Sequence, residues 1–307
     1  MNDFVGLVVR FTSFIALLGI IGAVAFRLLV LPRADVTTVT RPFANARAAN
    51  IGIIGAAVLL PVAFVKLLLQ TAAMRFADDS WIEVGKRMAL ETDWGHMWVL
   101  QCVTSVLLIG AFAFARRNSA SRWVVTTLLV FVLIASQSLS GHAMSPHRWA
   151  GITVFVDAAH LLGAGLWLGT LGVMYSTVSK PASQFTQGFA EHIMALLSAF
   201  SPLALFASAL VALSGLVSSF AHLEHLNEFV TTQYGITILA KVASVGVVAL
   251  FGFRNWKIMT PLVLQENGAV RMTRAMRTEL LCTLLVLLVT AVLVVTGPPM
   301  APGMVMP

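Results

Sequence analysis

The chain has 307 residues, of which 58% are hydrophobic and only 11% are charged, and its mean hydropathy is +0.89. These values exclude an ordinary soluble domain, and uncharged runs long enough to cross a bilayer recur along the whole length. We therefore predict one integral membrane domain, residues 1–307, that folds as an all-α, polytopic transmembrane helix bundle. The net charge of +7 does not by itself indicate a nucleic-acid partner, and we expect none, because in a membrane protein the placement of basic residues matters more than their sum.

The apolar runs predict about eight spans. In chain order they cover residues 4–31, 48–76, 93–115, 123–140, 152–176, 193–217, 235–253 and 278–296. The first run lacks the basic start and the small-residue cleavage site of a signal peptide, so we expect it to be retained as a span. No internal repeat is evident in the sequence.

The distribution of Lys and Arg predicts the orientation of these spans. The loops after the first, third, fifth and seventh spans hold twelve basic residues, whereas the other loops and both tails hold three. Short loops rich in Lys and Arg remain on the cytoplasmic side. We therefore expect both termini to face outward.

Most of the histidines fall on the predicted outer side. They are His96 at the start of the third span, His142 and His147 after the fourth, His160 inside the fifth, and His222 and His225 after the sixth, with only His192 on the inner side. Methionines share this side, namely Met144 between two histidines and Met300, Met304 and Met306 in the Met-rich tail, residues 297–307.

Imidazole and thioether groups together are the ligand set that suits Cu(I). We therefore interpret these residues as candidate copper ligands, with the tail methionines as a possible metal entry. A purely structural role stays open for each of them, because a methionine in a membrane helix usually packs in the core and an interfacial histidine is often only an amphipathic anchor. The sequence HLEH, residues 222–225, fits a metal-binding helix face or a solvated loop, and the tail fits an unstructured segment equally well.

Charged residues inside spans are costly unless they are paired or hydrated, so they mark structural pairs or pathways. Asp157 and Lys241 are predicted at similar depths below the outer face, which favours a buried ion pair. Asp157 also lies three residues before His160 on one helix face, so it can instead accept a hydrogen bond from that imidazole. Trp167 lies deeper than an interfacial residue, and its indole N–H therefore needs a partner. The small residues around it, Gly163 to Gly169, predict close approach of another helix.

Several stretches resemble the CopD family of bacterial inner-membrane copper-resistance proteins. They are GHA at 141–143, D-x-x-H at 157–160, W-L-G at 167–169, FSPLALFASALVALSG at 200–215, TQYGITILAKV at 232–242 and RN at 254–255. The resemblance covers about residues 90–262, and we match neither the first ninety residues nor the tail.

The resemblance implies copper movement across the bacterial inner membrane, usually uptake, with a separate CopC-like periplasmic carrier as donor and periplasmic N and C termini. The positions that it carries over are His142, Asp157, His160, Trp167, Tyr234, Gly235 and Lys241.

Two other functions remain open from the sequence. Paired histidines on transmembrane helices also ligate haem b in electron-transfer proteins, and a single outer haem held by His96 and His160 fits the pattern. The chain could equally bind copper as an assembly or sensing partner without transporting it. No nucleotide-binding motif is present to drive transport. Direction, Cu(I) versus Cu(II), and oligomeric state are not determined by the sequence.

Overall fold

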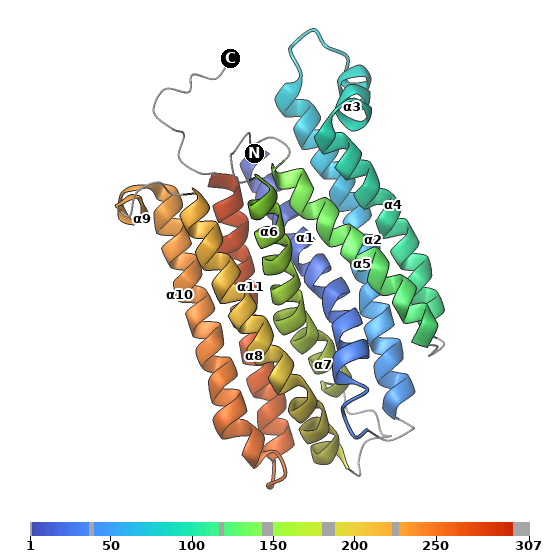
Figure 1. Cartoon of the computed structure of the whole chain (residues 1–307), viewed down its shortest axis with the longest axis vertical. Helices are drawn as coiled ribbons and strands as arrows, with labels where there is room; N and C mark the ends of the chain where they lie inside the picture. The colour runs from blue at the N-terminus through green and yellow to red at the C-terminus, as the bar shows by residue number, and fades with distance from the viewer. Residues whose placement is uncertain are drawn as a thin grey trace.

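The computed structural model describes residues 2–36, 40–116, 120–142, 150–179, 188–222 and 227–296, and within these ranges it contains helices and no strand. Eight of the helical segments are long and apolar enough to cross a membrane by length and composition. The prediction of an all-α bundle with about eight spans is therefore confirmed (Figure 1).

The helices of the N-terminal half are α1 (Asn2–Ala25), continued by the π-helical segment η1 (Phe26–Val30), α2 (Thr40–Met74), α3 (Trp81–Leu90), α4 (Asp93–Ala115) and α5 (Ala120–His142). Those of the C-terminal half are α6 (Ala150–Ala164), the π-helical segment η2 (Gly165–Gly169), α7 (Thr170–Val178), α8 (Phe189–His222) and α9 (Glu228–Thr231). They are followed by α10 (Gln233–Arg254), the π-helical segment η4 (Asn255–Met259), the short 3-10 turn η5 (Thr260–Leu262) and α11 (Gly268–Thr296).

One predicted helix boundary is wrong, and one short helix was not predicted. Helix α11 begins at Gly268, ten residues before the predicted start at 278. Its first turns carry Arg271, Arg274 and Arg277, which lower the local hydropathy although long basic side chains can extend from a helix toward water. The segment around Trp81 was predicted as a loop but forms the short amphipathic helix α3.

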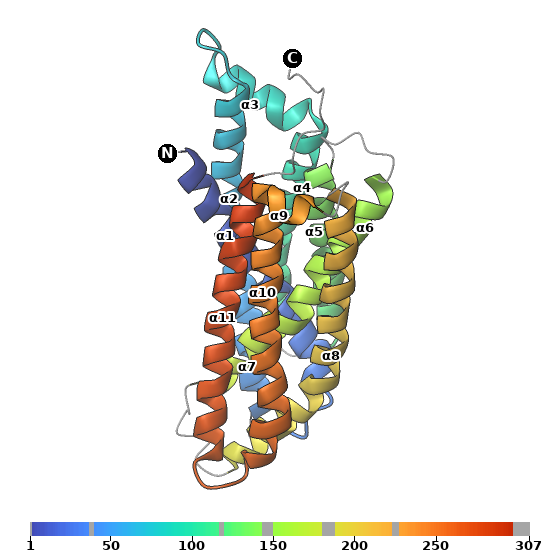
Figure 2. The same ribbon diagram turned by 90° about the vertical axis from the view of Figure 1, so that its left-hand side faces the viewer.

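The first turn of α1 and the last turn of α11 lie at the same end of the bundle, which we call the terminal end (Figure 1 and Figure 2). The opposite end, which we call the basic end, holds the connections α1–α2, α4–α5 and α10–α11. Its described basic residues include Arg33, Arg41, Arg116, Arg122, Arg254 and Lys257. This is the end that the charge distribution predicts to be cytoplasmic, and the orientation in the membrane stays a prediction.

Helix α1 lies in the centre of the bundle. It packs against α2 on one side and against η2, α7 and α11 on the other, so it joins the helices of the two halves (Figure 1). Ile20 of α1 and Phe26, the first residue of η1, are fully buried. The backbones of α1 and η2 approach most closely at Gly22 and Gly169, where an added Cβ on either glycine would overlap backbone atoms of the other helix. The predicted close approach of a helix to the small residues before and after Trp167 is confirmed.

This contact gives a stability prediction. We expect Gly169→Ala to lower the free energy of unfolding by about 1–3 kcal/mol, because the new methyl group forces two tightly packed backbones apart. Thermal unfolding of the purified protein in detergent measures the change. Gly110→Ala on α4 is the matched control, since a Cβ there meets open space. Equal melting temperatures for the two variants would contradict the proposed close packing.

Hydrogen bonds of Asn45 join η1, α2 and α4 at the basic end. Asn45 on α2 is fully buried, and its Oδ1 accepts a hydrogen bond of 2.7 Å from Nε of Arg27 in η1. Its Nδ2 donates to the carbonyl oxygens of Ala115 and Arg116, each at 3.2 Å, where α4 ends. One amide side chain therefore satisfies a guanidinium and two carbonyl groups that a membrane helix end would otherwise leave without partners.

A local motif occurs twice, although the sequence showed no obvious repeat. Thr92 precedes α4 and Thr232 precedes α10, and each hydroxyl accepts a hydrogen bond from the backbone N–H of the glycine three residues later, at 2.9 and 3.0 Å. A short helix, α3 or α9, comes directly before each cap. Nine residues after the capping threonine stand Gln101 in α4 and Lys241 in α10. The two helices therefore present a polar side chain at the same depth in the two halves of the chain.

Candidate functional site

The imidazole of His160 lies between α6 and α8. Its Nδ1 is 3.0 Å from Oγ of Ser214, and its ring edge faces Gly215, which leaves room for it. The hydroxyl of Ser214 donates its own proton to the carbonyl oxygen of Leu210 at 2.5 Å. Oγ also lies 3.3 Å from the carbonyl oxygen of Val211, whose backbone is hydrogen-bonded to His160 as well. When the hydroxyl donates to either backbone carbonyl, Oγ accepts from the imidazole, and on that ground we assign the hydrogen of the neutral ring to Nδ1. This arrangement leaves the lone pair on Nε2, the form in which a histidine binds a metal while its other nitrogen is held by a hydrogen bond.

Charged and polar residues from α6, α8 and α10 lie near this imidazole or interact with its neighbours. Lys241 of α10 interacts electrostatically with Asp157 and with His160. Tyr234, near the start of the same helix, interacts electrostatically with Asp157. We call His160, Asp157, Ser214, Tyr234 and Lys241 the imidazole cluster. The negative and positive side chains in it offset one another, and the neutral ring remains available as a donor of electron density.

The structure thus brings together four of the residues singled out from the sequence, from positions far apart in the chain. The fifth member, Ser214, was missed because a serine in an apolar helix gives no signal by itself. Its partner is 54 residues away in sequence. Trp167 follows His160 by seven residues, or about two helical turns, and it therefore lies deeper in the bundle, within η2.

His96 is separate from the imidazole cluster. It is exposed in the first turn of α4, and its Nε2 lies 3.0 Å from the carbonyl oxygen of Leu90, the last residue of α3. Helix α4 packs against α2, α3 and α5, whereas the His160 ring faces α8. The structure therefore places the two histidines proposed as a haem pair in different surroundings, each with a hydrogen-bond partner of its own.

Other candidate ligands cannot be placed. Met144, His147, His225, Met300, Met304 and Met306 lie outside the described residues, and His142 and His222 end α5 and α8 with side chains that are not described. Among the residues that the structure does describe, no three His, Cys, Asp or Glu side chains gather to form a metal site.

A second polar cluster surrounds Trp167, and its central residue was missed. Glu279 of α11 is only 4% exposed, and its Oε2 accepts a hydrogen bond of 2.8 Å from Nδ2 of Asn255. The side chain of Trp167 is also hydrogen-bonded to Glu279. The indole therefore has the partner that its depth required. Because α11 was predicted to begin at 278, Glu279 was expected at a helix end, where a carboxylate is unremarkable.

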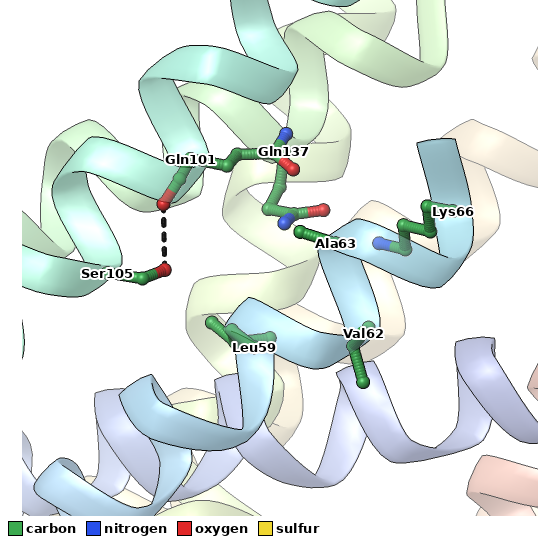
Figure 3. Close-up of a pocket in the computed structure, with 7 residues that line it drawn as sticks. All are labelled: Leu59, Val62, Ala63, Lys66, Gln101, Ser105 and Gln137. Carbon is green, nitrogen blue, oxygen red and sulfur yellow. Dashed lines mark hydrogen bonds between the residues drawn. The ribbon is translucent and has the colours of Figure 1, made fainter. Parts of the chain in front are cut away.

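A third polar group lies in the N-terminal half. Lys66 of α2, Gln101 and Ser105 of α4 and Gln137 of α5 line a pocket of about 10 Å³, roughly the space that one water needs (Figure 3). Figure 3 shows the Lys66 amine and the Gln137 amide directed toward this space. Gln101 is fixed from α5, since its Nε2 donates to the carbonyl oxygen of Ser136 at 3.0 Å. Lys66 thus has polar surroundings inside the bundle.

The described sites belong to a chain with recognisable relatives. A family model described as "Copper resistance protein D-like, N-terminal domain" matches residues 1–152, and one described as "Copper resistance protein D" matches residues 194–293. The chain belongs to the copper resistance protein D (CopD) family. The family likeness therefore includes the first ninety residues, which the motifs in the sequence did not cover.

Two curated proteins are similar to this CopD-family chain. It is 26% identical over 320 residues to copper resistance protein D of Pseudomonas syringae pv. tomato, with 99% of this chain and 100% of that protein covered. It is 28% identical over 155 residues to copper transport protein CutJ of Bacillus subtilis (strain 168), an alignment that covers 49% of this chain and 28% of that longer protein. No solved structure matches the chain. Family membership and the eight apolar helices together make it a multi-pass membrane protein with a copper-related function.

Proposed function

We propose that this CopD-family protein transports copper across the bacterial cytoplasmic membrane in the direction of uptake, and that His160 is the first ligand inside the bundle. The observation that carries the proposal is the hydrogen bond from Nδ1 of His160 to Ser214 Oγ, which leaves Nε2 to bind the ion. An ionisable residue buried in a span is a functional candidate by default. The names of the relatives, copper resistance protein D and copper transport protein CutJ, supply the metal.

In this proposal the terminal end faces the periplasm and receives copper from a CopC-like carrier. His142, Met144 and His147 belong to the connection from α5 to α6, directly before the helix that carries His160. Together with His222, His225 and the tail methionines they would supply the imidazole and thioether groups that favour Cu(I). The charges of Asp157 and Lys241 would then set the electrostatic balance that a cation meets at His160.

A pair of serine variants tests the role of Ser214 in orienting the imidazole. We expect Ser214→Ala to weaken Cu(I) binding at His160 by about 10-fold to 100-fold, because the ring loses the partner that fixes its tautomer and orientation. Ser219→Ala is the matched control, since that hydroxyl donates only to the carbonyl oxygen of Gly215 in its own helix. Competition with a chromophoric Cu(I) chelator measures the affinity. Equal affinities in the two variants would contradict this orientation.

Transport itself is tested with His160→Ala in proteoliposomes that contain a Cu(I)-sensitive dye. Uptake should fall to the level of empty vesicles, while His96→Ala, which removes an exposed histidine bonded to a backbone carbonyl, should retain most of it. Full uptake by His160→Ala would overturn the assignment of the ligand. Binding by the wild type without any uptake would show a copper-binding partner in place of a transporter. A Soret band in the purified protein would instead indicate haem.

A further inference from the structure

A large cavity lies in the half of the bundle nearer the basic end, between α8, α10 and α11. Its volume is about 560 Å³, and apolar side chains form most of its wall. The polar residues Asn255 and Glu279 and the indole of Trp167 line it as well. Glu279 stands eleven residues after the start of α11, or about 16 Å along the helix, and it follows the arginines of the first turns of that helix.

The amide of Asn255 has an unused acceptor. Asn255 is 6% exposed, its Nδ2 donates to Glu279, and its Oδ1 is buried with no hydrogen-bond partner among the described residues. A buried polar atom without a partner costs about 1–3 kcal/mol, so its persistence calls for a ligand or water. Asn255 is one of the residues that line the cavity, although Oδ1 itself has almost no accessible surface, so a ligand from the cavity reaches this atom only when neighbouring side chains move.

The carboxylate beside it has only neutral partners. The hydrogen bonds described for Glu279 come from the amide of Asn255 and the side chain of Trp167, neither of which carries charge. Gly252 leaves space next to it, because an added Cβ there would lie 3.1 Å from Oε1 of Glu279. A carboxylate buried in a membrane span is stabilised by a positive partner, and a metal cation at this position would supply one.

Two thioether side chains complete a possible ligand set. Met272 and Met276 are almost fully buried and line the same cavity as Glu279. The three residues stand at positions i, i+4 and i+7 of α11, so they form one stripe along the helix. Methionines at such spacing are usually core, but here they share the cavity wall with an unpartnered amide oxygen and a buried carboxylate. The two thioethers favour a soft cation such as Cu(I), whereas the carboxylate and amide oxygens by themselves suit Mg²⁺ or Ca²⁺, so the methionines supply the selectivity of this set.

The backbone is irregular at the same place. Trp167 is in the π-helical segment η2, and Asn255 begins the π-helical segment η4. Single π turns occur preferentially at functional sites, because the extra residue changes the direction in which neighbouring side chains point. Two of the three described π-helical segments thus converge on Glu279 from different helices.

We propose that Met272, Met276, Asn255 Oδ1 and Glu279 form a second Cu(I) site, on the basic-end side of the imidazole cluster. The proposal rests on the proposed function, since it takes copper as the cargo. His160 and Trp167 are seven residues apart, or about 10 Å along the helix axis. His160 contacts α8 and Trp167 lines the cavity, so in this proposal the imidazole site comes first and the second site lies deeper along the same helix.

The test counts Cu(I) equivalents bound by the purified full-length protein in detergent, in competition with a chromophoric Cu(I) chelator. We expect the double variant Met272→Leu, Met276→Leu to bind one equivalent fewer than wild type. Met174→Leu, at a fully buried methionine of α7 that does not line the cavity, should bind the wild-type number. Glu279→Gln keeps the shape and one acceptor oxygen while it removes the negative charge, and it should weaken the same equivalent at least 10-fold.

The outcomes separate the two proposals. Both proposals are supported if His160→Ala loses one equivalent of Cu(I) and the double methionine variant loses a different one. The variant that combines all three substitutions should then have lost both equivalents. If His160→Ala binds the wild-type number of Cu(I) ions while the methionine variant binds one fewer, the imidazole site is contradicted and the second site is supported. Wild-type stoichiometry in the methionine variant together with unchanged affinity in Glu279→Gln would overturn the second site.

Discussion

Replacing Lys241 with methionine is expected to lower the free energy of unfolding by about 3–5 kcal/mol, the cost of leaving a buried charge without its counter-charge. In the wild type the Lys241 ammonium interacts electrostatically with Asp157, and both residues lie within membrane spans. Surroundings of this kind provide no bulk water to screen or solvate a lone carboxylate. The effect is therefore far larger than that of an exposed ion pair.

Denaturation in mixed micelles measures this loss, and a second substitution identifies its cause. The double variant Asp157→Asn, Lys241→Met removes both charges and should recover most of the stability, because no unpaired charge remains. Lys86→Met on the exposed face of α3 serves as the control for the loss of a lysine, with an expected change within about 0.5 kcal/mol. If the double variant were no more stable than Lys241→Met, the two side chains would not be energetically coupled.

Asn45→Leu should be nearly as damaging, with a loss of about 3 kcal/mol or more. The leucine occupies a similar volume but leaves Nε of Arg27 and the carbonyl oxygens of Ala115 and Arg116 without the amide that binds them. Each buried polar group that loses its partner costs about 1–3 kcal/mol. Because these groups come from η1 and from the end of α4, the variant should loosen the basic end of the bundle.

Hydrogen exchange of the backbone amides near residues 27 and 115 would report that local loosening, beside the global unfolding measured in mixed micelles. Asn50→Leu, five residues further along α2, is the matched control, because that half-buried asparagine has no described side-chain hydrogen bond. Equal protection and equal stability in the two variants would show that the hydrogen bonds of Asn45 do not join the three helices.

The spans could be predicted from the sequence because the bilayer requires long apolar helices, whatever their packing. Residues 93–115 were predicted from their apolar run with the bounds that α4 has, and in the structure a threonine caps this helix at its start while Arg116 follows its end. Residues 268–277 were not predicted as helix, because three arginines lower the mean hydropathy of this stretch to that of a loop. With the helix start placed too late, Glu279, which is hydrogen-bonded to Trp167 and Asn255, was not recognised as a buried residue.

The candidate site could be predicted only in part, for a related reason. Asp157 and Lys241 were placed at similar depth by counting residues from the ends of their spans, and the structure brings them together. The contact of His160 with Ser214 depends on how α6 rotates against α8, and no sequence pattern specifies that rotation. Small residues decide it, because Gly163 and Gly215 allow the two helices to approach closely.

The π-helical segment η2 has a consequence for how this helix is compared between relatives. One π turn accommodates one residue more than an α turn, so the residues after 169 are rotated by about 100° from where a regular helix would place them. A helical wheel drawn from residue 150 to residue 178 therefore assigns the residues on one side of the segment to the wrong face. A relative with a single residue deleted between 165 and 169 would not simply have a shorter helix. The two halves of its helix would have a different relative rotation, and the side chains above and below the deletion would no longer face the same neighbours.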